Sequence, residues 1–206
     1  MLPASKMTAT GELEAWMPAH AQTSTEAIVA AGRLLLEEHG VNALTMRAVA
    51  DAVGVRTPSL YKRVHSRADL LRLILEDVAD ELTALLDAAA SSADPAADLR
   101  AMAVGYRRFA HANPVAWALL SAPQAVSGAT ARSERSSATL LRVVTELAGP
   151  QRALPAARTI VTWAHGFIAM ELAGAFRLGG DIEEAWEFGL SRVLPAVRRG
   201  DNGQRR

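Results

Sequence analysis

Apolar residues recur every three or four positions along most of the chain, with polar residues between them. Ile28, Ala31 and Leu35 would share one face of a helix, and Leu70 and Ile74 would share one face of another. This spacing is typical of amphipathic helices, which bury one stripe against a core. No segment alternates between apolar and polar residues over a useful length, so we predict an all-α fold.

Short-range signals mark the first two helices. Thr23, with Glu26 three positions later, forms a capping box for the first helix, and Gly40 is suited to a left-handed C-cap. Thr45 caps a second, short helix, which Gly54 ends.

Further signals divide the rest of the chain. Thr57 is a good N-cap residue and Pro58 suits the first helical position, so a third helix is predicted at about 58–64. Ser66 and Asp69 form a second capping box and open a longer helix. Breaker and capping residues then predict helices at about 95–112, from Pro114 to near Pro123, at 131–147, at 155–178, and from Asp181 to about 198.

The composition is that of an ordinary globular protein. The 206 residues are 50% hydrophobic and 21% charged, with no cysteine. Collagen-like, disordered and disulfide-stabilised classes are therefore excluded, as are thiolate nucleophiles and cysteine-bound metals. No apolar stretch reaches the roughly 18 residues that span a bilayer, and the N-terminus is unlike a signal peptide, so we expect a soluble intracellular protein.

Charge is neutral in sum but unevenly distributed. From Thr45 to Arg67, five basic residues stand against one acidic residue, a net of +4, whereas 68–100 holds eight acidic and two basic residues, a net of −6. A compact basic block points to a polyanionic partner. The alternative is a solvated surface of mixed charge.

The titratable residues form no recognisable catalytic or metal-binding pattern. The five histidines lack the Glu-x-x-His and His-x-x-x-His spacings, and no serine or lysine sits in a known nucleophile motif. We therefore expect a protein that is not an enzyme and that holds no cofactor or metal ion.

The segment 45–61 joins two short helices through a glycine-containing turn. This is the layout of a helix-turn-helix, whose second helix can enter a DNA major groove about 12 Å wide. The inner face would hold the apolar residues Val49, Ala50, Val55 and Leu60. The outer face of the second helix would hold the polar residues Thr57, Ser59, Lys62 and Arg63. The alternative is a plain corner of a helical bundle.

The pattern Thr-Met-Arg-x-Val-Ala-x-x-Val-Gly-Val, followed by Leu-Tyr-x-x-x-x-Ser-Arg-x-x-Leu-Leu, resembles the DNA-binding domain of the TetR family of bacterial transcriptional regulators. The resemblance runs from about Thr23 to Leu75. Two positions depart from it. Val64 stands where the family usually has Phe and makes a smaller core contact, and Arg67 replaces the usual Lys, which keeps the charge but changes its geometry.

The second half resembles a C-terminal domain that occurs in part of this family and is named for a Trp-His-Gly motif. The matching residues run from Tyr106 to Pro114, followed by Trp163 and His165-Gly166, with Ala164 separating Trp from His.

The resemblance implies a homodimeric repressor that binds a palindromic operator in double-stranded DNA and is released by a small-molecule effector. Such a bacterial protein is cytoplasmic and associates with the nucleoid when bound to DNA. The alternative is a DNA-binding regulator without a small-molecule effector, either constitutive or controlled by a protein partner. The chain then divides into a flexible leader (1–22), a helix-turn-helix domain (23–67), a helical effector-binding and dimerisation domain (68–200) and a flexible tail (201–206).

The resemblance also implies DNA contacts. Thr45 lies at a helix N-terminus, where the helix dipole favours an anion such as phosphate. Further phosphate contacts are expected from Tyr61, Arg67 and Lys62, which would set the register. Contacts at base edges are expected from Arg47, Arg56, Thr57 and Ser59. Pro58, which lies between these residues, is also counted in the expected DNA-binding site. Each of these side chains can alternatively be solvated.

Two sites are expected in the second half. An effector pocket with apolar walls is expected from Met102, Tyr106, Phe109, Trp117, Trp163, His165, Phe167, Met170 and Glu171. A core histidine with its hydrogen bonds satisfied is the alternative for His165. A dimer interface is expected on the last two helices from Ala169, Ala173, Gly174, Trp186, Gly189 and Val193, with intramolecular core as the alternative.

Overall fold

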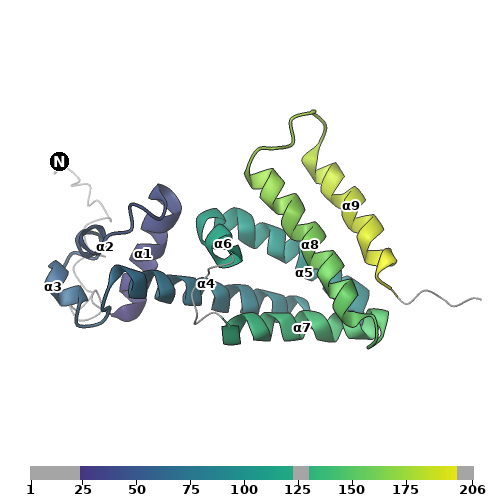
Figure 1. Cartoon of the computed structure of the whole chain (residues 1–206), viewed down its shortest axis with the longest axis horizontal. Coiled ribbons are helices and arrows are strands. Elements are labelled where there is room, and N and C mark those ends of the chain that lie inside the picture. Colours follow the sequence, from purple (N-terminus) through teal and green to yellow (C-terminus); the bar gives the residue numbers. More distant parts are fainter. Residues whose placement is uncertain (1–23, 123–129, 199–206) are drawn as a thin grey trace, which may run out of the picture. The chain divides into compact units, whose positions relative to one another are not determined.

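The computed structural model describes residues 24–122 and 130–198, and within these ranges every regular element is a helix. The predicted all-α fold is thereby confirmed. Figure 1 shows the helices in chain order. The predicted leader (1–22) and tail (201–206) lie outside the described residues. No helix in the described part of the chain is both long and apolar enough to cross a lipid bilayer.

The chain divides into two compact units, one up to Ile74 and one from Leu75 onward. The boundary between them lies inside the 23-residue helix α4 (Arg67–Ala89). The domain limits expected from the sequence, 23–67 and 68–200, stay a prediction.

The first unit consists of three helices and the beginning of α4. These helices are α1 (Thr25–His39), α2 (Met46–Ala52) and α3 (Thr57–Leu60), and α2 packs against both of the others. Fully buried side chains from all four helices and their connections form the core: Ile28, Leu36, Leu44, Val49, Ala50, Leu60, Val64, Leu70 and Ile74. Burial of one large aliphatic side chain stabilises a fold by about 1.5–3 kcal/mol, so this small unit depends on nearly all of them.

Several predicted boundaries in this unit are confirmed. Gly40 ends α1 with a φ of 77°, a left-handed angle that favours glycine. The Thr45 hydroxyl caps α2 by accepting a hydrogen bond from the Ala48 amide at 3.1 Å. At the start of α4 the Ser66 hydroxyl accepts from the Asp69 amide, also at 3.1 Å.

The cap of α1 differs from the prediction by one residue. Ser24 occupies the N-cap position, and its hydroxyl accepts a hydrogen bond from the Ala27 amide at 3.1 Å. Thr23, the predicted cap, lies outside the described residues.

The third helix is shorter than predicted. Thr57 is its first residue and not its cap, a position that Arg56 occupies without a side-chain hydrogen bond. The helix ends at Leu60, because the chain turns there: the Leu60 carbonyl accepts from the amides of both Arg63 and Val64 at 2.9 Å. The turn brings Val64 into the core as the predicted apolar contact beneath α3.

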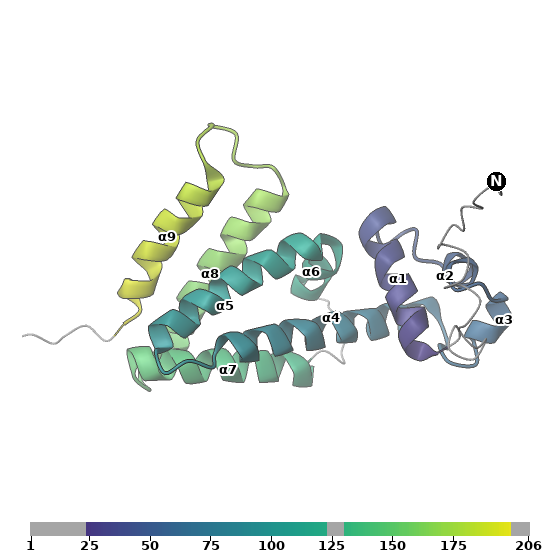
Figure 2. The ribbon, with the colours of Figure 1, turned by 180° about the vertical axis from the view of Figure 1, so that it is seen from behind.

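The second unit contains the rest of α4 and five further helices within the described ranges. These are α5 (Pro95–Ala112), α6 (Pro114–Ser121), α7 (Thr130–Ala148), α8 (Ala153–Leu172) and α9 (Ile182–Ala196). α5 packs against α6, α7, α8 and α9, and α8 also packs against α7. Figures 1 and 2 show α8 and α9 as antiparallel neighbours joined by a loop.

The core of this unit lies where α5, α7, α8 and the ends of α4 and α9 meet. Its buried members are Ala90, Leu99, Met102, Val143, Val144, Ala148, Ala156, Ala157, Ile160 and Val197. The small side chains of Ala148, Ala156 and Ala157 allow α7 and α8 to approach closely, which a larger residue at these positions would prevent.

The structure corrects the predicted length of α8. The sequence predicts a helix to about residue 178, because Gly179 and Gly180 follow, but α8 ends at Leu172. Gly179 and Gly180 have positive φ angles in the following loop.

Gly174 causes the early end of α8. It adopts a φ of 61°, its amide donates to the Glu171 carbonyl at 3.0 Å, and the Ala175 amide donates to the Met170 carbonyl at 2.9 Å. This pair of bonds is a Schellman motif, which satisfies the last helical carbonyls and turns the chain away. Gly174 therefore lies in a helix cap. The predicted dimer interface would instead need it on the face of a helix.

Two glycines test how tightly α8 and α9 pack. A Cβ atom at Gly189 of α9 would lie 2.5 Å from Cζ2 of Trp163 in α8, whereas a Cβ at Gly166 would meet no atom within 4 Å. We expect Gly189→Ala to lower the free energy of unfolding by about 1–3 kcal/mol through overpacking. Gly166→Ala should instead raise it by about 0.5–1 kcal/mol. Urea denaturation measures both, and the same sign for the two variants would contradict the described packing.

Candidate nucleic-acid interface and ligand cavity

The turn between α2 and α3 depends on one glycine and one backbone hydrogen bond. Gly54 adopts a φ of 69°, and the Val55 amide donates to the Ala50 carbonyl at 2.9 Å. Val49 and Leu60, one from each helix, are fully buried beneath the turn. The predicted helix-turn-helix is thereby confirmed, with the polar side of α3 left at the surface.

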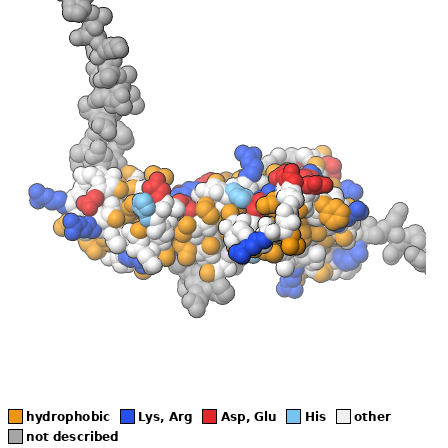
Figure 3. All heavy atoms as spheres, turned by 90° about the horizontal axis from the view of Figure 1, so that it is seen from above, with side chains coloured by type: hydrophobic (Ala, Val, Ile, Leu, Met, Phe, Trp, Pro, Cys, Tyr) orange, Lys and Arg blue, Asp and Glu red, His pale blue; other side chains and the backbone are white. Residues whose placement is uncertain are grey.

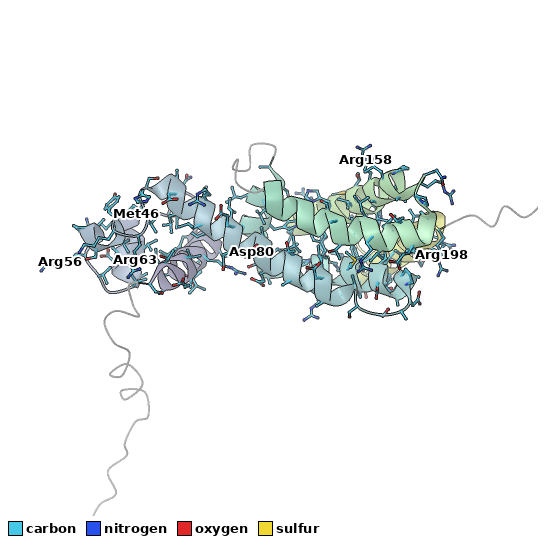
Figure 4. All side chains as sticks on the ribbon, turned by 90° about the horizontal axis from the view of Figure 1, so that it is seen from below. Met46, Arg56, Arg63, Asp80, Arg158 and Arg198 are labelled. Atoms are coloured by element: carbon cyan, nitrogen blue, oxygen red, sulfur yellow. The ribbon has the colours of Figure 1, made fainter. Side chains whose placement is uncertain are left out.

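The residues predicted to contact DNA lie together on α2, α3 and their flanks. Seven are exposed, namely Thr45, Arg47, Arg56, Pro58, Tyr61, Lys62 and Arg67, and two are half-buried, namely Thr57 and Ser59. Figure 4 shows Arg56 pointing away from the helices of this unit. Figure 3 shows basic side chains protruding from the surface of the same unit. Their contact with DNA stays a prediction.

Arg47 is only weakly engaged within the chain. Its Nε lies 3.9 Å from the Asp51 carboxylate, and the two side chains are 88% and 72% exposed. An exposed pair of this kind contributes about 0–1 kcal/mol at most, so phosphate or a base edge can compete for the guanidinium. Tyr61, directly after α3, is 49% exposed.

Arg67 has a structural task that the sequence does not reveal. Its Nε donates to the Leu44 carbonyl at 2.7 Å, and its Nη2 donates to the Val41 carbonyl. The planar guanidinium thus holds the loop between α1 and α2 just before the Thr45 cap. The single ammonium group of Lys cannot reproduce this fork, so the replacement of the usual Lys matters to the loop. A phosphate contact by Arg67 would use its remaining N–H groups.

Loss of the paired hydrogen bonds from Arg67 should weaken the attachment of the loop between α1 and α2. We expect Arg67→Lys to lower the free energy of unfolding by about 1 kcal/mol, because one charged donor no longer reaches its carbonyl. Arg56→Lys, at an exposed position, serves as the matched control and should change stability by less than about 0.5 kcal/mol. Guanidinium chloride denaturation compares them, and equal losses in the two variants would refute the structural role.

A cavity of about 280 Å³ lies in the second unit, among α4, α5, α6, α7 and α8. Its lining residues are Ala79, Leu82, Leu86, Leu99, Met102, Ala103, Tyr106, Trp117, Leu120, Ser121, Ser137, Leu140, Ile160, Val161 and Ala164. Most of these side chains are apolar, and none carries a charge. This composition suits a small, mostly apolar molecule.

The structure brings three of the nine predicted pocket residues to this cavity: Met102, Tyr106 and Trp117. The other six do not line it, namely Phe109, Trp163, His165, Phe167, Met170 and Glu171. The sequence also misses the contributions of α4 and α7, because periodicity shows that a helix has an apolar face but not what that face encloses.

His165 contacts two residues of the cavity wall. Its Nδ1 lies 3.1 Å from the Tyr106 hydroxyl, and its ring stacks on Trp117 with the centroids 4.5 Å apart. Burial lowers the pKa of His165, which favours the neutral ring. These contacts hold the ring inside the domain, with one of its nitrogens hydrogen-bonded.

Trp163 and Phe167 belong to an aromatic cluster between α8 and α9. Trp163 stacks on Trp186 with centroids 4.8 Å apart, and Phe167 contacts both Trp186 and Phe176. Trp186 is only 1% exposed within the single chain. Edge and stacked contacts of this kind stabilise by about 0.5–1.5 kcal/mol beyond the buried area.

The six residues predicted for a dimer interface therefore do not form one surface. Trp186 and Gly189 pack against Trp163 within the chain, and Val193 packs against the core. Ala169 is half-buried, and Ala173 and Gly174 are exposed at the end of α8. Large apolar side chains are nevertheless exposed on α8, α9 and the loop between them: Met170, Phe176, Leu178, Ile182 and Phe188. Figure 3 shows hydrophobic side chains on this part of the surface.

Glu171 is paired with Arg107, a residue that the sequence analysis missed. Arg107 Nε and Nη2 donate to the two Glu171 carboxylate oxygens at 2.9 and 2.7 Å, and Nη1 donates to Glu183 at 2.7 Å. His111 Nε2 lies 3.0 Å from Glu171, and the Arg107 guanidinium lies 5.0 Å from the Trp186 ring centre. The bidentate pair ties α5 to both α8 and α9.

A sequence signal for this network does exist. A carboxylate on the apolar stripe of a helix needs a cationic partner, because an unpaired buried charge is costly. Glu171 gives that signal, but nothing in the sequence identifies the arginine that pairs with it. Among the described side chains, no three His, Asp or Glu residues are placed to hold a metal ion.

The network should make stability depend on pH. Hydrogen bonds from Arg107 hold the pKa of Glu171 below its ordinary 4.5, against the opposing effect of burial, and His111 lowers it further. The stabilisation is therefore complete above about pH 4.5 and is lost as pH falls through the lower folded-state pKa. We expect the loss of unfolding free energy in Glu171→Gln to be large at neutral pH and to shrink over that acidic range.

Denaturation at several pH values measures this difference between variant and wild type. Glu146→Gln removes an exposed pair with Arg142, whose side chains are 50% and 52% exposed, and is the control, expected to cost about 0.5 kcal/mol or less. A Glu171→Gln cost that does not change with pH would contradict the charged pair.

Comparison with known proteins gives two family matches. Residues 28–74 match the family described as bacterial regulatory proteins, tetR family, and residues 99–193 match the family described as tetracyclin repressor-like, C-terminal domain. The first match contains the helix-turn-helix, and the second contains most of the cavity wall. The Trp-His-Gly subtype of the second domain stays a prediction.

Related proteins are described as HTH-type transcriptional regulators. An HTH-type transcriptional regulator of Mycobacterium tuberculosis is 37% identical over 120 residues, which are 57% of this chain and 51% of that protein. An uncharacterised HTH-type transcriptional regulator of the same organism is 29% identical over 160 residues, 75% of this chain and 72% of that protein. The chain thus matches about half the length of the first relative.

Solved structures show the same fold. A protein of unknown function from Rhodococcus sp. RHA1 is 26% identical, with a TM-score of 0.75, over 85% of this chain and 95% of its own. A TetR variant from Acinetobacter baumannii in complex with minocycline is 21% identical, with a TM-score of 0.61, over 84% of this chain and 95% of its own. At that identity the second likeness concerns the fold alone.

Proposed function

The chain belongs to the TetR family of bacterial regulatory proteins, and from this premise we propose that it binds DNA and regulates transcription. The observation that carries the proposal is the α2–turn–α3 unit, which holds its apolar residues inside and presents exposed basic and polar side chains outside. A helix-turn-helix built in this way can place its second helix in a major groove.

The exposed residues would make two kinds of contact with DNA, one to phosphates and one to base edges. Thr45, at the N-terminus of α2, and Tyr61 and Lys62, after α3, would bind phosphates and set the register. Arg47 and Arg56 would read base edges, since a guanidinium can pair with guanine through two hydrogen bonds. Arg67 would chiefly position the loop that leads to Thr45, because two of its N–H groups already hold carbonyls.

We further propose a homodimer that binds a palindromic operator as a cytoplasmic repressor. The exposed apolar side chains on α8, α9 and their loop support an interface there, because contiguous exposed apolar surface marks sites of association. The two recognition helices of such a dimer would face half-sites about 34–36 Å apart, or somewhat more.

The cavity supports release by a small molecule over the alternative of a regulator without one. Large side chains do not close it, and about 280 Å³ remains open among five helices. Ligand pockets usually measure about 300–1,000 Å³, so the cavity fits a small effector. A ligand releases DNA only if it binds the DNA-free conformation more tightly than the DNA-bound one.

Selection of bound sequences from a random duplex pool tests the proposal. We expect a palindrome, and log affinity for it should fall with log salt by about 0.9 for each phosphate contact. Tyr61→Phe should weaken binding to all sequences alike, whereas Arg47→Ala should relax the preference at one base pair by about 1–3 kcal/mol.

The control is Arg158→Ala, on the surface of α8, which removes one positive charge outside the proposed DNA-binding surface (Figure 4). It should leave operator affinity unchanged. A flat salt response would refute phosphate binding by α2 and α3. An unaltered sequence preference in Arg47→Ala would show that this residue does not read a base.

A further inference from the structure

The segment that leaves α3 has little apolar anchoring. Within residues 61–66, all of which the structure describes, Val64 is the one buried residue, and the others are exposed. Val64 is also smaller than the Phe that the family usually has at this position, so it buries less apolar surface. The path of this segment, which carries Tyr61 and Lys62, therefore depends on polar contacts.

Asp69, in the first turn of α4, makes such contacts. Its Oδ2 accepts a hydrogen bond from the His65 amide at 2.9 Å, and its Oδ1 accepts from Arg72 Nη2 at 2.6 Å. Its own amide donates to the Ser66 hydroxyl at 3.1 Å. Only 18% of the Asp69 side chain is exposed, which suits a group that contacts the protein and not a ligand. One carboxylate thus holds the segment 61–66 at the residue after Val64.

The charge of Asp69 is unexpected beside a surface proposed to bind phosphates. The His65 amide holds the pKa of Asp69 below its ordinary 3.8, and Arg72 lowers it further, so the carboxylate is ionised at neutral pH. It lies two positions beyond the basic block 45–67, whose net charge is +4. A negative charge here repels the DNA backbone and should by itself weaken binding.

Two residues of the same helical turn support both ends of the helix-turn-helix. Arg67 donates to carbonyls of the loop just before Thr45, and Asp69 accepts from the amide of His65, four positions after Tyr61. The proposed phosphate contacts at Thr45 and Tyr61 therefore share one support. Their relative placement matters, because phosphate contacts set the register of a protein on the duplex.

We propose that Asp69 is a positioning residue for DNA binding, which fixes the segment 61–66 so that Tyr61 and Lys62 reach their phosphates. Asp69 itself does not touch DNA. This inference rests on the proposed function, since it names a residue on which the DNA-binding surface depends. Loss of the carboxylate releases the His65 amide and lets the segment move, so binding weakens although a negative charge is removed. A purely electrostatic role predicts the opposite sign, tighter binding.

Fluorescence anisotropy of the full chain on the selected operator measures affinity over a range of salt concentrations. At low salt we expect Asp69→Ala to bind about 10-fold more weakly, which corresponds to the loss of one hydrogen bond to a charged group. The slope of log affinity against log salt should become shallower by about 0.9 to 1.8, the effect of one or two phosphate contacts. A variant that is merely less stable presents fewer folded molecules but keeps the wild-type slope.

Two further variants and a control sharpen the test. Asp69→Glu keeps a carboxylate, which a Glu at this helical position can turn back toward the preceding amides, and should restore most of the affinity. Glu38→Gln removes a negative charge from α1, where the side chain is 66% exposed, and should change affinity less than about twofold. If circular dichroism shows that Asp69→Ala does not fold, Asp69→Asn keeps the shape and one acceptor oxygen and should show the same two effects, each smaller.

Double-mutant cycles identify the residues through which Asp69 acts. Lys62→Ala and Tyr61→Phe should each cost less in the Asp69→Ala chain than in the wild type, because the phosphate contacts are already weakened there.

Tighter or unchanged binding by the folded Asp69 variant, a wild-type salt slope in it, or additive losses in both cycles would overturn the inference and leave the proposed function standing. A wild-type chain that binds no duplex would instead refute the proposed function, and the inference with it.

Discussion

The paired charge of Arg107 links three helices of the second unit, α5, α8 and α9. Its side chain is 13% exposed, so its charge must be neutralised where it lies, and Glu171 and Glu183 do so from α8 and α9. The Trp186 ring, 5.0 Å away, covers part of the same group. The three helices can shift relative to one another only by breaking this pairing, and two of them, α5 and α8, also provide walls of the cavity.

Much of the fold could be predicted from the sequence because its signals are local. A capping residue such as Thr45 and a left-handed glycine such as Gly40 act within one helical turn, and both lie where expected. The helix-turn-helix is predictable for the same reason, since its apolar contacts are only a few residues apart. Predicted helix boundaries are wrong where two signals compete. At the end of α8, Gly174 ends the helix before the chain reaches the glycine pair that was expected to end it.

The cavity was less predictable, because its walls depend on contacts between distant segments. Trp163 and Phe167 have the aromatic character of pocket residues, yet they pack against α9 and not toward α4. Glu171 was expected in a pocket and instead serves as the anchor for Arg107, 64 positions earlier in the chain. Periodicity identifies the buried face of a helix, but it does not identify the helix that covers that face.

The stacking of Trp163 on Trp186 has an optical consequence. Two indole chromophores with ring centres 4.8 Å apart and planes inclined by 27° couple electronically when they absorb light. Near-ultraviolet circular dichroism of the chain therefore contains a contribution that exists only while α8 and α9 remain side by side. Trp117 stands apart from this pair, against His165, so its emission reports on a different place in the same unit. Within the described part of the chain, the tryptophans thus provide two natural reporters, one for the helical hairpin of α8 and α9 and one for the cavity.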